Sequence, residues 1–284
     1  MENALAATDE SVAAKRATAG TGLLQVVDVG GRSVVSRAYA TSPLRWLMPR
    51  NHGHAAWVYS STFGGGLVDG DALNVQIEVG PAATALLATQ ASTKIYRSPR
   101  GTSSHLQAHV HAGACLVLLP DPVVPFAGAR YRQSQQIDVA ADASLIVVDW
   151  VSSGRVAHGE RWLFERLRTS LRVRYDGRLV CHDAVTLDAS DGALADRMGR
   201  FDVLATVVLM GPRCREAVEA ILGAARADGP APRADLYRAV APLGASGALV
   251  RLAGRSVEQV GHSLRAALQF LPRLVGDDPW ARTW

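Results

Sequence analysis

Lysine, cysteine and long apolar runs are scarce in this chain of 284 residues. The three cysteines, Cys115, Cys181 and Cys214, are far apart and form no C-x-x-C pair. Neither a disulfide framework nor a structural zinc site is therefore indicated, and a reducing compartment fits best. No apolar run approaches the ~20 residues that a membrane-spanning helix needs. We expect a cytoplasmic globular protein that does not enter a membrane.

The charge balance is close to neutral for a chain of this length. Thirty basic and 26 acidic residues give a net charge of +4, which gives little support for nucleic acid or membrane binding. Nearly all the basic residues are arginines, and Lys94 is the only lysine beyond residues 1–20. It is kept either by chance or because a compact ammonium group is needed there. Residues 1–20 lack a secretory signal pattern, and we expect them to form a disordered tail.

Most of the chain shows the residue alternation of a β protein. Every second residue of 73–79 is apolar, which predicts a strand with one buried face, and residues 105–111 and 167–175 show the same period. More fully buried strands are predicted at residues 34–39, 55–59, 85–89, 115–119, 145–150, 179–182, 201–210 and 248–252. Glycine, proline and aspartate separate these segments, which favours a mainly β fold. Periodicity leaves a sandwich, a barrel and a β-solenoid open.

Two helices are predicted in the last third of the chain. Apolar residues between 214 and 225 recur at spacings of three and four, which places them on one helical face. Ser256 and Gln259 have the spacing of a capping box, and an apolar stripe follows them to Leu271. No fixed-period internal repeat is visible, and we expect residues 21–284 to form a single domain.

The stretch FGGGLVDGDAL, residues 63–73, combines clustered glycines with two acids. It does not fit a phosphate-binding loop, because a strand follows it, no lysine follows the glycines, and the acids would repel an anion. A calcium loop fails because its fifth position falls on a leucine. Glycines here allow positive φ or a close approach of the backbone in a turn. The glycines of this turn are Gly65, Gly66 and Gly70. Asp69 and Asp71 either fasten the turn or form a functional acidic pair.

Three histidines are candidate metal ligands. His105, His109 and His111 share one face of the predicted strand at 105–111. Histidines two residues apart on a strand are roughly 7 Å apart and can share a metal ion. With Asp69 and Asp71 they would suit a metal-dependent hydrolase. The alternative is a solvated face, because the opposite side of this strand is the apolar one.

Three arginines form a basic stripe on another predicted strand. Arg168, Arg172 and Arg174 lie on the polar face of residues 167–175. Such a stripe is either a solvated face or a docking surface for an acidic partner. A basic-surface binding module is therefore a further candidate function.

Four motifs occur together and in order along the chain. They are Gly65-Gly-Leu-Val-Asp-Gly-Asp71, Thr89-Gln-Ala-Ser-Thr-Lys-Ile-Tyr-Arg97, Leu119-Pro-Asp-Pro-Val-Val-Pro-Phe126 and Gly154-Arg-Val-Ala-His-Gly-Glu160. In this order and spacing they resemble the UreD (also called UreH) family of urease accessory proteins, over about residues 23–274. The resemblance implies a mainly β, β-helix-like stack of short strands with two α-helices. It also implies that the protein is not an enzyme.

The resemblance implies partners as well. Members of the family form a cytoplasmic complex with a helical accessory subunit, UreF, and a nickel-binding GTPase, UreG, and this complex docks on apo-urease so that nickel enters its active site. We therefore expect a UreF-like subunit, a UreG-like GTPase and apo-urease as partners, with two copies of this chain in the complex. No cofactor is expected to bind tightly, because nickel would be a transient cargo.

A route for a transient ion needs polar ligands that also release it. Carboxylates in weak, incomplete sites meet this need better than a tight cluster of histidine and cysteine. We hypothesise that four acids line or border such a route and that Lys94 balances their charge. These acids are Asp69, Asp71, Asp149 and Glu160. The alternative for each is an ordinary pairing within the fold.

Overall fold

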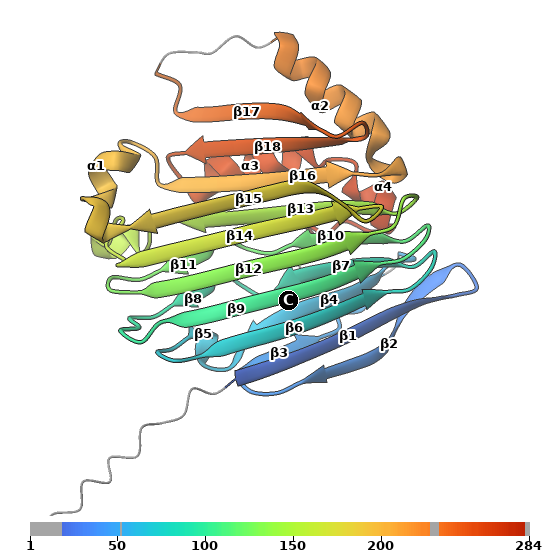
Figure 1. The fold of residues 1–284 in the computed structure, drawn as a ribbon, viewed down its shortest axis with the longest axis horizontal. Coiled ribbons are helices and arrows are strands. Elements are labelled where there is room, and N and C mark those ends of the chain that lie inside the picture. The colour runs from blue at the N-terminus through green and yellow to red at the C-terminus, as the bar shows by residue number, and fades with distance from the viewer. Residues whose placement is uncertain (1–18, 52, 228–232, 282–284) are drawn as a thin grey trace, which may run out of the picture.

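The strands of the protein form two sheets that face each other (Figure 1). The computed structural model describes residues 19–51, 53–227 and 233–281. One sheet has seven strands in the order β15-β14-β12-β9-β6-β1-β2. The other has eleven, with β17-β18-β16-β13-β10-β7-β4-β3 as its main path and three short strands beside it. Of the expected tail at 1–20, residues 1–18 lie outside the described residues, and β1 begins at Ala19.

Each of the eleven predicted strand segments overlaps a strand of the structure, but seven further strands of the described residues, among them β1 and β12, were not predicted. The seven-stranded sheet contains β1 (Ala19–Val29), β2 (Arg32–Ala40), β6 (Ala72–Val79), β9 (Thr102–Val110), β12 (Arg130–Val139), β14 (Arg166–Tyr175) and β15 (Arg178–Asp188). The main path of the other sheet contains β3 (Leu44–Leu47), β4 (Ala56–Thr62), β7 (Thr84–Thr89), β10 (Cys115–Leu119), β13 (Ser144–Ser152), β16 (Val203–Met210), β17 (Leu236–Leu243) and β18 (Gly247–Gly254). The short strands are β5 (Gly66–Leu67), β8 (Thr93–Ile95) and β11 (Val123–Pro125).

The chain builds both sheets at once by alternating between them. Strands β6, β9 and β12 belong to the seven-stranded sheet, and the next long strands along the chain, β7, β10 and β13, belong to the other. Neighbouring strands within each set pair in parallel. Each passage through both sheets is therefore one turn of a stack, which confirms the predicted β-helix-like arrangement of short strands.

Buried alanines mark the tight turn that leads from one sheet to the other. Ala83, Ala114 and Ala143 occupy the same place in three successive turns, 31 and 29 residues apart, and each has a relative exposure of 0%. The turns bind each other, because the N–H of Cys115 donates to the carbonyl of Ala83 (2.8 Å) and that of Ser144 to the carbonyl of Ala114 (2.9 Å). The unequal spacing explains why a search for a fixed period shows no repeat.

Two hydrophobic cores lie on the two sides of the eleven-stranded sheet. The first fills the space between the sheets, with Ile77, Leu116 and Val147 among its fully buried members. The second lies between the outer face of the eleven-stranded sheet and the helices α2 (Arg215–Ala227), α3 (Val257–Ala267) and α4 (Leu271–Val275). The seven-stranded sheet has no helix over its outer face among the described residues (Figure 1), so that face is polar.

The described residues contain four α-helices rather than the two predicted. Helices α2 and α3 are the predicted pair, and the hydroxyl of Ser256 caps α3 by accepting from the N–H of Gln259 at 3.2 Å. The apolar stripe that was expected to run to Leu271 as one helix is divided, because α3 ends at Ala267 and α4 begins at Leu271. Pro272 has no N–H and cannot continue the hydrogen bonding of α3. The short α1 (Leu194–Met198) carries too few residues to show a period. The remaining helical segments are single 3₁₀ turns, η1 (Phe63–Gly65), η2 (Val156–His158), η3 (Ala189–Asp191) and η4 (Pro212–Cys214).

Two strands that were expected to be fully buried are largely exposed. In β2, Val34 has a relative exposure of 38% and Tyr39 of 51%, and in β15 Leu179 has 54%. The physical reason is their place in the sheet, since β2 and β15 are its two edge strands. An edge strand of a sheet with one uncovered face has few neighbours to bury it.

We predict that the turn alanines limit the stability of the stack. Replacing Ala114 by leucine overfills a site between two hydrogen-bonded turns, and we expect the free energy of unfolding to fall by about 1–3 kcal/mol in urea titrations. Ala112→Leu is the matched control, because Ala112 is exposed two residues earlier in the same turn, and its effect should stay within about 0.5 kcal/mol. Equal effects of both substitutions would contradict this view of the turn.

Candidate functional site

The four sequence motifs meet along one side of the stack of turns. The short strands β5, β8 and β11 form a parallel ladder there, in which Gly66 pairs with Lys94 and Val124 with Lys94 from the other side. Strand β11 also pairs with β13 through Val123 and Val151, which ties the ladder to the eleven-stranded sheet. A Cβ on Gly66 would lie 2.5 Å from the carbonyl oxygen of Lys94, so this close approach requires glycine. In Figure 1 the three short strands lie together at the left.

The two acids of the glycine-rich stretch hold the loops beside the short-strand ladder in place. Asp69 accepts hydrogen bonds from the backbone N–H and from Nε of Arg100, both at 2.8 Å, and this pairing holds the pKa of Asp69 below its usual range. Asp71 accepts from the N–H of Val68 at 2.9 Å, within its own turn, in which Gly70 has a φ of 90°. Neither aspartate lines the two cavities described below.

Glu160 is also engaged in holding loops together. Arg155 forms a bidentate ion pair with its carboxylate, which lowers the pKa of Glu160, and the N–H of Ala127 donates to the same group at 3.1 Å. The guanidinium of Arg155 also lies 4.2 Å from the ring centre of Phe126. Glu160 therefore connects the loop around η2 to the segment that follows β11.

Lys94 lies on the outside of the short-strand ladder. Its side chain is exposed, and within residues 19–51, 53–227 and 233–281 its ammonium group has no ion pair or hydrogen bond. Among the described residues it forms no ion pair with the acids with which it was grouped from sequence. Its carbonyl, rather than its charge, makes the close contact with Gly66.

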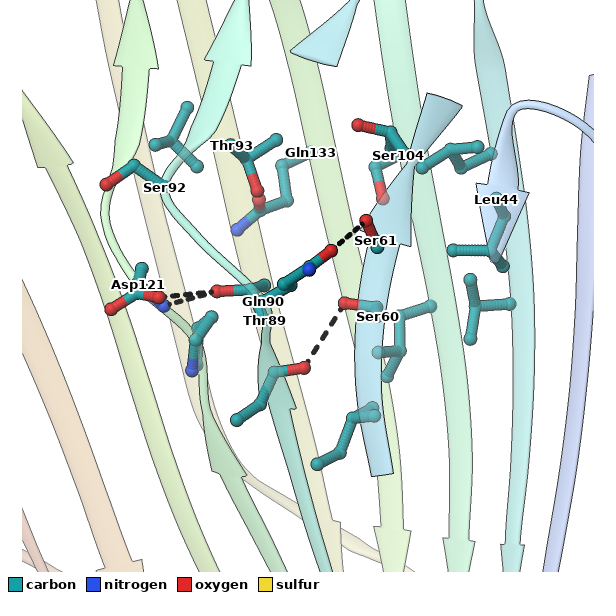
Figure 2. Close-up of a pocket in the computed structure, with 18 of the residues that line it drawn as sticks. Leu44, Ser60, Ser61, Thr89, Gln90, Ser92, Thr93, Ser104, Asp121 and Gln133 are labelled. Carbon is teal, nitrogen blue, oxygen red and sulfur yellow. Dashed lines mark hydrogen bonds between the residues drawn. The ribbon is translucent and has the colours of Figure 1, made fainter. Parts of the chain in front are cut away.

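A cavity of about 230 Å³ opens behind the ladder, between the two sheets. Its polar lining includes Ser60, Ser61, Thr89, Gln90, Thr93, Asp121, Gln133 and Asp149. Hydrogen bonds fix several of these groups, since Ser61 Oγ donates to Gln90 Oε1 at 2.7 Å and Thr89 Oγ1 donates to Asp121 Oδ2 at 3.2 Å (Figure 2). Leucine and valine side chains of both sheets, together with Trp46, Trp150 and Tyr131, contribute much of the apolar wall.

Asp149 is an acid that lines this cavity in the interior of the protein. It lies on β13 between Val147 and Val151, which point into the core between the sheets. Burial raises the pKa of Asp149 to about 6; the hydrogen bond from Gln133 Nε2 (2.9 Å) opposes this shift, and the negative charge of Asp183 adds to it. Its carboxylate nevertheless keeps contact with the cavity and is partly accessible.

A hydrogen-bonded chain orients the Asp149 carboxylate. The hydroxyl of Tyr131 donates to Gln133 Oε1 at 3.2 Å, which leaves the amide nitrogen of Gln133 to donate to Asp149. Burial raises the pKa of Tyr131, so that its hydroxyl keeps its proton. Among the described side chains, Gln133 is the one hydrogen-bond donor to Asp149.

Asp149 also lines a second, smaller cavity of about 40 Å³ on its other side. This space contains Asp183, which is 8% exposed, accepts a hydrogen bond from Thr206 Oγ1 at 3.1 Å and is paired with Arg251. Asp121, Asp149 and Asp183 thus follow one another from the first cavity to the second. Of these three acids, only Asp149 was assigned to an ion route from sequence. Asp183 was detectable as an acid at an inward position of an alternating strand.

The three candidate metal-binding histidines do not converge. His105 Nδ1 lies 2.7 Å from Ser134 Oγ, His109 lies 3.7 Å from Asp138, and His111 lies 2.9 Å from Glu78, so each imidazole pairs with a neighbouring strand. No group of three or more histidine, cysteine, aspartate or glutamate side chains in the described part of the chain has an arrangement that could hold a metal ion. All three lie toward the uncovered face of the seven-stranded sheet.

The basic stripe lies on that same uncovered face. Arg168, Arg172 and Arg174 are exposed along β14, and Arg172 Nε is 3.4 Å from His182 Nε2 on β15. The sheet and its buried side chains separate the stripe from the cavity. No helix within residues 19–51, 53–227 and 233–281 is both long and apolar enough to cross a membrane.

We predict that Asp149 lowers stability at neutral pH. The folded chain keeps its proton up to about pH 6, whereas the unfolded chain releases it near pH 3.8, so the folded state loses stability as the pH rises between these values. The shift of about two pKa units corresponds to at most ~3 kcal/mol, and hydration of the cavity reduces this to about 1–2 kcal/mol.

The test is a comparison of urea unfolding at pH 4 and pH 7.5. We expect Asp149→Asn to be more stable than the unmodified chain at pH 7.5 and equal to it at pH 4. Asp176→Asn, in the exposed turn between β14 and β15, is the control and should show no such difference, because asparagine accepts its φ of 50°. A pH-independent effect of Asp149→Asn would contradict the assignment.

Comparisons with known proteins agree on one family. Residues 19–284 match the family model described as UreD urease accessory protein. The urease accessory protein UreD of Sorangium cellulosum is 54% identical over 94% of this chain and 85% of its own length, and that of Anaeromyxobacter sp. is 44% identical over 93% and 90%. The urease accessory protein D of Arabidopsis thaliana is 37% identical over 69% of each chain. The chain therefore belongs to the UreD family of urease accessory proteins, which are not enzymes.

Proposed function

We propose that this protein is a scaffold for urease maturation that acts together with a UreF-like helical subunit and a UreG-like GTPase. In this proposal the three proteins dock as a cytoplasmic complex on apo-urease, with two copies of this chain, and support GTP-dependent insertion of nickel. Family membership supports the role in urease maturation. The cavity between the sheets supports a specific part for this chain, which is to let the ion pass.

The series of acids at Asp121, Asp149 and Asp183 is the observation that carries the ion passage. These carboxylates lie in two adjoining cavities. A hydroxyl group contacts Asp121 and an amide group contacts Asp149, whereas Asp183 is held by Thr206 and by an ion pair with Arg251. Oxygen ligands of this kind bind a divalent ion only loosely when they are single and incomplete, which suits transfer better than storage. The Asp149 carboxylate has a pKa of about 6, so it is largely ionised at neutral pH and is available to the ion.

The passage proposed here differs from the route expected from sequence. Beside the short-strand ladder, Arg100 and Arg155 donate hydrogen bonds to Asp69 and Glu160, respectively. Asp71 accepts a hydrogen bond from the backbone N–H of Val68. We assign them to holding the short-strand ladder in place. In the proposed passage, Asp121 and Asp183 replace these three acids and accompany Asp149.

The two competing functions have weaker support. A metal-dependent hydrolase needs ligands that converge, but His105, His109 and His111 each pair with a different side chain, Ser134, Asp138 and Glu78 respectively. A binding module that uses Arg168, Arg172 and Arg174 would act on a face remote from the motifs and the cavity. We keep this stripe as a possible docking surface for a partner of the complex.

We predict that removal of the Asp149 carboxylate impairs urease activation. In cells that produce urease with all its accessory proteins, Asp149→Ala should leave the amount of urease unchanged and lower its nickel content and activity at least five-fold, because a ligand of the passage is lost. Nickel per urease active site is measured on purified urease by elemental analysis.

Asp69→Asn is the matched control, because Asp69 is an acid beside the short-strand ladder whose carboxylate is paired with Arg100 at the surface. It should retain most of the activation. Co-purification of each variant with its partners separates loss of transfer from loss of assembly. Normal nickel loading in the presence of Asp149→Ala would refute the passage through this cavity.

A further inference from the structure

An open groove runs along the outer side of the helical layer. It has a volume of about 920 Å³ and lies between α2 on one side and α3 with α4 on the other. Small residues form both walls, with Ala217, Ala220 and Ala224 on α2 and Ser263, Ala266 and Ala267 on α3. Ile221, Phe270 and Leu274 are its larger apolar residues. The helices pack on the sheet beneath them but leave this space between themselves unfilled.

The shape of the groove suits a further helix. Ala217, Ala220 and Ala224 are spaced by three and four residues, so they share one face of α2. Side chains of this size let a neighbouring helix approach to the usual packing distance of about 8–10 Å without meeting large groups. Helix α2 has 13 residues and is therefore roughly 20 Å long, which accommodates three to four turns of an occupant.

The charge of the groove indicates which charged residues a bound helix would carry. Arg213, Arg238 and Arg273 contribute three positive charges, whereas Glu216 is the only acid among the described residues that line the groove. Arg213 is fixed by donating to Thr84 Oγ1 and to the carbonyl of Gly113, both at 2.7 Å, and these neutral acceptors do not cancel its charge. In the described part of the chain, neither Arg238 nor Arg273 has a carboxylate partner. Unbalanced arginines beside a groove favour an acidic partner.

We propose that this groove binds an amphipathic helix of another protein, one with small apolar residues on the buried face and aspartate or glutamate along its flanks. The helix would lie between α2 and α3, with its acids facing Arg238 and Arg273. The groove lies on the far side of the eleven-stranded sheet from the acidic cavity. The proposal is therefore independent of the ion passage and stands or falls separately.

Binding of synthetic helical peptides to the full chain tests the proposal. The probes are an 18-residue fluorescent peptide with an alanine and leucine stripe flanked by glutamates, and the same peptide with lysines in place of the glutamates. Fluorescence anisotropy should show at least ten-fold tighter binding of the acidic probe, and added salt should weaken it.

Two variants locate the binding in the groove. Ala220→Trp fills the space from an exposed position and should weaken the acidic probe at least ten-fold, whereas Glu219→Trp, the adjacent exposed residue that does not line the groove, should have little effect. The double variant Arg238→Glu, Arg273→Glu should reverse the preference and bind the basic probe more tightly. Misfolding cannot produce such a reversal.

Three results would overturn the proposal. One is equal affinity of the unmodified chain for the two probes, and another is unchanged binding by Ala220→Trp. The third is concentration-dependent self-association that Ala220→Trp abolishes in sedimentation experiments, which would make a second copy of this chain the occupant.

Discussion

Hydrogen bonds between successive tight turns are the constraint on which the rest of the structure depends. Each tight turn carries a buried alanine that lies against the following turn. The backbone carbonyls of Ala83 and Ala114 accept hydrogen bonds from backbone N–H groups of that following turn. These bonds hold the strands of both sheets in parallel register at once. A larger side chain at these positions would separate two turns and shift two ladders together. The facing sheets and the hydrophobic core between them follow from this spacing.

The cavity forms where the motifs interrupt that register. Strand β7 ends at Thr89 and β8 starts at Thr93, whereas β10 ends at Leu119 and β11 starts at Val123. Pro120 and Pro122 lie in the second interruption, and proline has no N–H to donate to a ladder. The chain therefore bends away from the main sheet, and the residues at the bend line the cavity. The sequence elements that mark the family also create the space between its sheets.

Much of the fold was predictable from sequence, because alternation along a strand is a local property. The strands at 73–79, 105–111 and 167–175 and the helices α2 and α3 follow directly from residue spacing. The candidate site was less predictable, because its partners are distant in the chain. Asp149 meets Gln133 and Asp183, and Asp69 meets Arg100, across strands whose pairing no local pattern specifies. An acid that fastens a loop and an acid that faces a cavity have the same local sequence signature until that pairing is known.

The strands at the ends of the stack have a consequence for assembly. The parallel turns are enclosed by antiparallel strands, since β2 pairs with β1 at one edge of the seven-stranded sheet and β15 pairs with β14 at the other. An open stack of parallel turns would offer each end as a template for another copy, as a growing filament does. Here the last strand at each end of the seven-stranded sheet runs in the opposite direction, so an added turn could not continue the parallel pairing of the stack.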